Sequence, residues 1–294
     1  MSIELRNFAD TGIKVTPLGF GAGLIGDESI SEKQIDKLLN TILDYGINLI
    51  DTARSYGISE QRIGKHISNR RSEFVLSTKI GYSVEGYQDW TYDCITAGIE
   101  RALQTLRTDY IDIVHLHSCS LETLQNTDVI EALVKAVASG KVRVAAYSGE
   151  NEALEYAIST NKFKSIMTSV NICDQKVIDT VISKTKKKNI AVIAKRPLAN
   201  IAWNYRERPY GNYCEEYWLR LNKMNLEFDI DWLELALRFS AFTEGVHSCV
   251  IGTTNLEHIK RNIEILEKGA LPSNITASIK SAFKLNDDNW LGQI

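Results

Sequence analysis

The chain of 294 residues carries 34 basic and 37 acidic side chains, a formal net charge of −3 and a hydrophobic fraction of 44%. The nearly balanced charge does not indicate a surface that binds nucleic acid, and no apolar run reaches the length of a membrane span. The N-terminus lacks the apolar core of a signal peptide, and the five cysteines show no CxxC spacing. We therefore expect a cytoplasmic protein with reduced thiols and no nucleic-acid or membrane partner.

The chain begins with a predicted hairpin and continues as a regular alternation of strands and helices. Residues 5–15 form the hairpin, with a turn at residues 10–12. The candidate strands that follow are Pro17–Gly21, Asn48–Asp51, Phe74–Lys79, Ile111–His117, Val142–Tyr147, Ile166–Ile172, Ile190–Lys195 and Cys249–Thr253. Helical patterns lie between them, including Ser31–Tyr45, Tyr92–Leu106, Val129–Ser139, Glu152–Thr160 and Lys176–Lys188.

Eight strands that alternate with helices predict an α/β fold of the (β/α)8 TIM-barrel type. Residues 1–294 form one barrel domain in this interpretation, with the N-terminal β-hairpin ahead of the barrel. A dinucleotide-binding doubly wound sheet is disfavoured, because residues 19–23 lack the GxGxxG spacing and no helix follows them in register.

One segment, residues 197–228, interrupts the alternation and is unusually aromatic. Its aromatic side chains include Trp203, Tyr205, Tyr210, Tyr213, Tyr217 and Trp218. Two interpretations remain open, a substrate lid at the active-site face and a packing helix.

Four chemically distinct side chains fall at the expected active-site face of the barrel. Asp51, Lys79 and His117 end predicted strands, and Tyr56 follows the second strand. A buried ammonium stabilises a neighbouring phenolate, a carboxylate keeps that ammonium charged, and an imidazole orients a carbonyl oxygen. Each residue alone is more typical of a turn, a helix cap or a solvated strand end. Their joint position at successive strand ends favours proton transfer to or from a carbonyl oxygen.

His115 and His117 also raise the alternative of a metal site, since residues two apart on a strand face the same side. The remaining histidines, at 66, 247 and 258, do not end predicted strands. We therefore expect no metal, and His115 is interpreted as a residue of the barrel interior.

Several ordered motifs resemble the aldo-keto reductase superfamily over nearly the whole chain. These motifs are Leu18–Gly21, Asn48–Ala53, Tyr56–Gly64, Ser77–Lys79, Tyr110–His117 and Gly140–Arg143. The resemblance implies a tetrad of Asp51, Tyr56, Lys79 and His117 that reduces an aldehyde, ketone or sugar carbonyl with NAD(P)H, or oxidises the corresponding alcohol. Tyr56 would be the general acid/base.

The resemblance also implies the contacts to the nicotinamide. Ser148 and Asn171 match residues that hold the carboxamide in the family. Met167 stands where the family often has Gln, and Lys195 stands where it has a stacking aromatic ring. Arg196 is a candidate to stack on or pair with the cofactor, with an ion pair at the barrel rim as the alternative.

The segment after the last strand matches the family's site for the adenosine phosphates. Its candidate cofactor contacts are Gly252, Thr253, Thr254, Asn255, His258 and Asn262. Gly252 and His258 stand where NADP-preferring members often carry basic residues. Lys260 and Arg261 are candidates to compensate, although helical spacing is expected to turn them away from the face of His258. NADP is the expected cofactor and NAD the alternative.

Trp90 and Trp203 are the candidate walls of an apolar pocket for a small-molecule carbonyl or alcohol. A different class of function is a nicotinamide-binding regulatory or interaction subunit with little turnover. Its mark would be a lost tetrad or a long appended segment, and neither is seen in the sequence. The sequence does not predict the oligomeric state.

Overall fold

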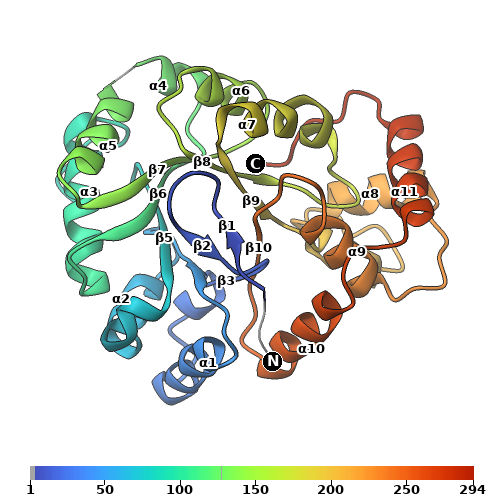
Figure 1. Cartoon of the computed structure of the whole chain (residues 1–294), viewed down its shortest axis with the longest axis horizontal. Helices are drawn as coiled ribbons and strands as arrows, with labels where there is room; N and C mark the ends of the chain where they lie inside the picture. Colours follow the sequence, from blue (N-terminus) through green and yellow to red (C-terminus); the bar gives the residue numbers. More distant parts are fainter. Residues whose placement is uncertain (1–3, 127) are drawn as a thin grey trace.

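A computed structural model describes residues 4–126 and 128–294, in which eight parallel strands close into a barrel (Figure 1). Neighbours around the barrel follow the order β10-β3-β4-β5-β6-β7-β8-β9. The strands are β3 (Leu18–Gly21), β4 (Leu49–Asp51), β5 (Val75–Ile80), β6 (Ile111–His117), β7 (Val142–Ser148), β8 (Ser165–Ser169), β9 (Ala191–Lys195) and β10 (Ser248–Ile251). The predicted TIM barrel is therefore confirmed.

The N-terminal hairpin is also confirmed. Strands β1 (Arg6–Asn7) and β2 (Lys14–Val15) pair antiparallel, with Arg6 opposite Val15. Buried side chains of the hairpin, including Phe8 and Ile13, join an apolar cluster with Leu49 and Val75, which begin β4 and β5. The hairpin thus covers the amino end of the barrel and leaves the carboxyl end for the site.

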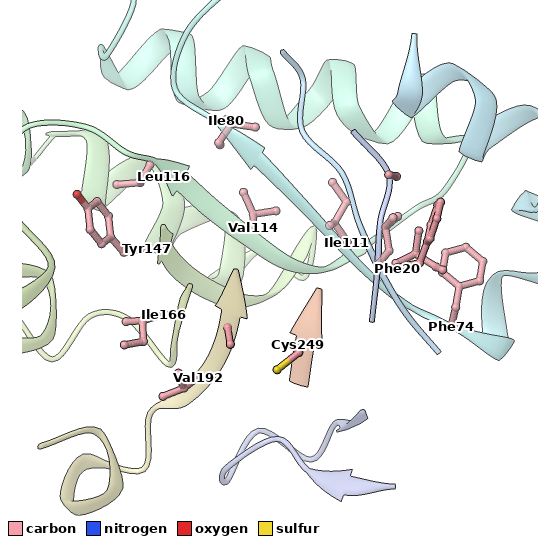
Figure 2. Close-up of a cluster of buried hydrophobic side chains, with 14 of the residues drawn as sticks. Phe20, Phe74, Ile80, Ile111, Val114, Leu116, Tyr147, Ile166, Val192 and Cys249 are labelled. Atoms are coloured by element: carbon pink, nitrogen blue, oxygen red, sulfur yellow. The ribbon is translucent and has the colours of Figure 1, made fainter. Parts of the chain in front are cut away.

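Helices surround the barrel and bury their apolar faces against its outer surface. They are α1 (Glu32–Asp44), α2 (Ser59–His66), α3 (Tyr92–Leu106), α4 (Leu121–Gln125), α5 (Asp128–Ala138), α6 (Asn151–Ser159), α7 (Ser183–Lys188), α8 (Glu215–Met224), α9 (Trp232–Ala241), α10 (Leu256–Glu267) and α11 (Ser273–Asn286). Figure 2 shows part of the layer between helices and strands, including Val114 of β6, Ile166 of β8 and Cys249 of β10. No helix of the described residues is long and apolar enough to cross a bilayer.

Two strands end earlier than predicted, which changes where polar residues lie. Strand β8 ends at Ser169, because the next residues form a turn in which Asn171 and Asp174 exchange backbone hydrogen bonds of 3.2 and 3.1 Å. Strand β10 ends at Ile251 rather than Thr253. The predicted helix Lys176–Lys188 contains a π-helical turn at Ile178–Ile182 before α7 begins.

The aromatic segment 197–228 contains features of both open interpretations. Helix α8 packs against α11 and against the turn after β8, where its buried Tyr217 donates a hydrogen bond of 3.1 Å to Asp174. Trp203 stacks on Trp232 of α9, with ring centroids 6.0 Å apart. Tyr213, just before α8, lines the cavity at the carboxyl end of the barrel. The packing interpretation therefore describes the helix, and the loop before it reaches the site.

Candidate functional site

The carboxyl ends of the strands enclose a cavity of about 740 Å³. Each strand ends at the same face because all eight are parallel, so side chains far apart in the sequence converge there. The structure brings together all four residues of the predicted tetrad in the wall of this cavity. Ser148, Met167, Lys195, Arg196 and Gly252 line the same cavity.

A buried ion pair lies at the base of the tetrad. Nζ of Lys79 is 2.6 Å from Oδ2 of Asp51 and donates a second hydrogen bond, of 2.9 Å, to the Thr52 carbonyl. Ser77 donates to the other carboxylate oxygen of Asp51 at 2.8 Å. Burial acts to lower the pKa of Lys79, but the charges of Asp51 and Tyr56 outweigh it and the pKa is raised. Lys79 is therefore an ammonium at neutral pH.

Tyr56 lies beside this ammonium, with Nζ of Lys79 4.7 Å from the centre of its ring. Two glycines fix the loop that carries Tyr56. Gly57 has a left-handed φ of +51°, and a Cβ there would lie 2.4 Å from the Gly26 carbonyl oxygen. A Cβ on Gly26 would lie 1.9 Å from the Tyr56 carbonyl oxygen. Larger residues at either position would push Tyr56 away from Lys79.

His117 completes the group as a neutral imidazole. Burial, followed by the charges of Lys79 and Lys195, lowers the pKa of His117 to about 3. Its Nδ1 is 2.9 Å from the hydroxyl of Tyr82, a contact that the sequence analysis missed. The signal was present, because Tyr82 follows Lys79, the tetrad residue that ends the predicted strand, by three residues.

A second buried ion pair lies in the cavity wall. Nζ of Lys195 is 3.3 Å from Oε1 of Glu150, and the Glu150 carboxylate also accepts hydrogen bonds from Thr168 (2.6 Å) and the Ser169 amide (2.8 Å). Burial lowers the pKa of Lys195, against the opposing charge of Glu150. The sequence motifs indicated Lys195 but not its partner Glu150, which follows strand β7 two residues beyond Ser148.

Arg196 is held by neutral partners. Its guanidinium lies 4.9 Å from the centre of the Tyr213 ring and donates to the Tyr213 hydroxyl, the Ser169 hydroxyl and the Gln293 carbonyl. Among residues 4–126 and 128–294, no carboxylate lies within ion-pair distance of Arg196. The rim ion pair considered from the sequence is therefore absent from the described residues.

The last residues of the chain return to the cavity. Figure 1 shows the C-terminal segment running from α11 back to the centre of the barrel. The side chain of Asn151 bonds both backbone groups of Gly292, at 2.9 and 3.1 Å, and Arg220 donates to the Leu291 carbonyl at 2.7 Å. Ile294 lines the cavity. Nothing in the local sequence indicated this contact, since the partners lie about 70 to 140 residues away.

A second hollow, of about 340 Å³, adjoins the cavity and shares Gly252 with it. Its walls include Leu198, Ile201, Trp203, Thr253, His258 and Asn262. Arg261 and Asp231 also line the hollow and form an ion pair of 3.1 Å. The expectation that Arg261 turns away from the face of His258 is therefore wrong, because the pair with Asp231 at the start of α9 draws its side chain to the hollow.

Other predicted residues lie outside the cavity. The side-chain amide of Asn171 is used within its turn, donating to the Arg196 carbonyl and accepting from the Cys173 amide. Thr254 lines neither hollow, and Asn255 caps α10 by accepting from the Glu257 amide.

The two tryptophans predicted to contact substrate lie apart from the tetrad. Trp90 packs on Tyr82, with ring centroids 5.6 Å apart, and Trp203 lies in the second hollow with His258. The cavity wall near the tetrad is instead formed by residues that include Tyr82, Tyr213 and Ile294.

The joined hollows fit an extended dinucleotide. Gly252 lies where the cavity and the hollow meet, and a Cβ there would lie 3.0 Å from the Gly21 carbonyl oxygen. Because Gly252 has no side chain, only backbone lies between the two spaces at this point. The hollow offers apolar walls, and the amide of Asn262 makes no hydrogen bond within the described part of the chain, although Asn262 is only 2% exposed. Apolar walls with a few free polar groups are typical of a nucleotide site.

Comparison with known proteins decides the family. The model of the aldo/keto reductase family matches residues 17–284. The chain belongs to the aldo/keto reductase family. This match, together with the similarity to oxidoreductases and to solved aldo-keto reductase structures, shows that the protein is an NAD(P)-dependent oxidoreductase of the aldo-keto reductase type.

Full-length relatives and a solved structure agree with this assignment. L-galactose dehydrogenase of Arabidopsis thaliana is 25% identical, over 89% of this chain and 87% of that protein. An uncharacterized oxidoreductase of Bacillus subtilis is 25% identical over 95% of this chain and 96% of its own length. The holo form of an aldo-keto reductase from Bacillus halodurans superposes with a TM-score of 0.82 at 25% identity, covering 95% of this chain and 96% of that one.

Proposed function

We propose that this aldo/keto reductase reduces the carbonyl of an aldehyde, ketone or sugar, with Tyr56 as the general acid. The observation that carries the proposal is the position of Lys79, which is 2.6 Å from Asp51 and 4.7 Å from the centre of the Tyr56 ring. The ammonium stabilises the phenolate that forms when Tyr56 gives up its proton. In the reverse direction, the same phenolate accepts a proton from an alcohol.

The residues divide the work around the carbonyl oxygen. Tyr56 donates the proton, Lys79 stabilises the charge left on Tyr56, and Asp51 keeps Lys79 charged. His117 is neutral, so it orients the oxygen by a hydrogen bond without competing as an acid. When bound, the reduced nicotinamide cofactor supplies the hydride to the carbonyl carbon. Ser148, Lys195 and Arg196 line the cavity and are the residues that would hold the nicotinamide end.

The cofactor preference follows from the charges in the second hollow. NADP is the cofactor expected from the family resemblance, but in the hollow Arg261 is already paired with the carboxylate of Asp231. Oδ1 of Asp231 accepts from the Leu233 and Glu234 amides at the start of α9. Its Oδ2 accepts no hydrogen bond within the described residues. A free carboxylate oxygen binds a ribose hydroxyl and repels a ribose phosphate, which supports a preference for NAD(H).

The decisive experiment follows dihydronicotinamide absorbance with NADH and NADPH in parallel, against a panel of aldehydes, diketones and sugars. We expect loss of absorbance with at least one carbonyl, faster with NADH at subsaturating concentration. A protein that binds either cofactor but oxidises neither with any carbonyl would contradict the proposal and favour a regulatory subunit.

A further inference from the structure

The imidazole of His117 is held between two tyrosine rings. Tyr82 stacks on it, with centroids 5.5 Å apart and ring planes 22° from parallel. Tyr56 meets it edge-on, at 6.1 Å and 83°. The Tyr82 hydroxyl is 2.9 Å from Nδ1 of His117 and 3.2 Å from the hydroxyl of Ser55. Within the described chain, Nε2 of His117 makes no hydrogen bond.

A neutral imidazole has one N–H, so the three groups admit two proton arrangements. In the first, Tyr82 donates to Nδ1 and the hydrogen of His117 lies on Nε2. In the second, Nδ1–H of His117 donates to Tyr82 and Tyr82 donates to Ser55. Only the first arrangement leaves a donor on the free nitrogen.

Elementary acid–base chemistry selects the first arrangement. A phenol is a stronger donor than an aliphatic hydroxyl, and an imidazole nitrogen is a stronger acceptor than a hydroxyl oxygen. The phenol–imidazole contact is also the shorter of the two, at 2.9 against 3.2 Å. Because Tyr82 has one hydroxyl hydrogen, this arrangement gives up the longer bond that Tyr82 is placed to donate to Ser55.

We propose that Tyr82 is a positioning residue that holds His117 in the Nε2–H tautomer, so that His117 donates a hydrogen bond to the carbonyl oxygen. This inference rests on the proposed function, in which the substrate oxygen lies between Tyr56 and His117. The partner of the second ring nitrogen commonly sets the tautomer of a functional histidine. Here that partner is a phenol from the loop after β5.

Trp90 and Gly81 hold the Tyr82 ring in place. Trp90 packs on the Tyr82 ring at 5.6 Å, and its amide donates to the Gly81 carbonyl at 2.8 Å. Gly81 has a φ of +139°, and a Cβ there would lie 2.0 Å from the Trp90 ring. Trp90, predicted to contact substrate, thus supports the residue that orients His117.

The tautomer can be read directly by long-range ¹H–¹⁵N correlation spectroscopy of the histidine rings in the cofactor-free protein. The chain has only five histidines, so His117→Gln identifies the His117 signals by their loss. We expect the Nε2–H pattern in the wild-type protein and in Ser55→Ala. In Tyr82→Phe we expect a mixture of tautomers. An Nδ1–H pattern in the wild-type protein would overturn the inference.

Turnover supplies the second readout. Tyr82→Phe should lower kcat by roughly ten- to a hundredfold, as for the loss of comparable outer hydrogen bonds, with a smaller change in KM. Tyr87→Phe is the matched control, since Tyr87 is an exposed tyrosine of the same loop that does not line the cavity. Equal tautomer populations and equal kcat in Tyr82→Phe and Tyr87→Phe would refute the role of Tyr82. The tautomer of His117 tests this inference, whereas cofactor oxidation by the wild-type protein tests the proposed function.

Discussion

The ammonium of Lys195 lies 3.3 Å from Oε1 of Glu150, so the cavity wall contains a second buried ion pair besides that of Lys79 and Asp51. In both pairs the lysine lies at the carboxyl end of a barrel strand, as the last residue of β9 or the last but one of β5, and the carboxylate comes from another element. A buried ammonium is costly without such a partner. Each carboxylate is therefore required for the charge that its lysine presents to the cavity.

Loss of the Asp51 charge should destabilise the protein as well as inactivate it. Asp51→Asn leaves Lys79 buried without a counter-ion, and breaking a buried pair costs about 3–5 kcal/mol. Chemical denaturation measures this loss of unfolding free energy. Glu100→Gln is the control, because it breaks a surface pair with Lys141 and should change stability little. Similar losses in both variants would contradict the structural role of Asp51.

Removal of the Tyr56 hydroxyl should abolish carbonyl reduction. Tyr56→Phe keeps the ring but removes the transferable proton, and general acid catalysis typically contributes 10²–10⁴-fold, roughly, to the rate. We expect NADH affinity, measured by fluorescence titration, to change little. Turnover equal to that of the wild-type protein would exclude Tyr56 as the acid.

The charge of Asp231 should control the choice of cofactor. Asp231→Asn keeps the Oδ1 acceptor that caps α9 but removes the negative charge, so the affinity for NADPH relative to NADH should rise about tenfold. Fluorescence titration of the two cofactors measures this ratio without turnover. Asp229→Asn makes the same charge change at an exposed position outside the hollow and should leave the ratio unchanged. A wild-type preference for NADPH would refute the proposed selection of NAD(H).

The buried carboxyl of Asp174 should make stability depend on pH. Burial, followed by the charge of Glu150, raises its pKa to about 7, against the opposing charge of Arg220. The carboxyl of an unfolded Asp has a pKa of about 3.9. Between about pH 4 and pH 7 the folded state therefore binds more protons than the unfolded state. The stabilising effect of protonation is complete below about pH 4 and is lost as pH rises through about 7.

Comparison with Asp174→Asn isolates this contribution. Between pH 5 and 8 we expect the wild-type unfolding free energy to fall by about 2–3 kcal/mol relative to the variant. Urea denaturation at each pH gives the two values. A constant difference across this range would show that the pKa of Asp174 is not raised.

The two hydrogen bonds from Asn151 should hold the C-terminal segment on the barrel. Asn151 has a φ of +55°, so Asn151→Gly preserves the backbone and removes only the amide. Loss of about 1–2 kcal/mol should speed amide exchange at Gly292 by roughly 5- to 30-fold. Asn189→Gly is the control, since Asn189 also has a left-handed φ of +51° but caps α7. Unchanged exchange at Gly292 would contradict the anchoring role.

The sequence predicted the barrel because each element is encoded locally. The run Ile111–His117 is rich in β-branched residues, namely Ile111, Ile113 and Val114, and it forms strand β6 with the predicted bounds. Thr91 caps the helix that begins at Tyr92 by accepting from the Cys94 amide at 3.2 Å. The ends of β8 and β10 differ from the predicted ones, because tertiary contacts decide where these strands end. Strand β8 stopped at Ser169 when Asn171 formed a turn with Asp174.

The sequence by itself determined which polar residues lie at or near the carboxyl ends of β4, β5 and β6, and parallel strands must deliver such residues to one face. It therefore placed Asp51, Lys79 and His117 together before any distance was known. Tertiary structure alone decided which residues from distant parts of the chain contact one another. Asp231 beside Arg261 and the C-terminal segment beside Asn151 are joined across 30 and 141 residues. Spacing along the chain carries no information about such contacts, because packing of whole elements brings these side chains within hydrogen-bond distance.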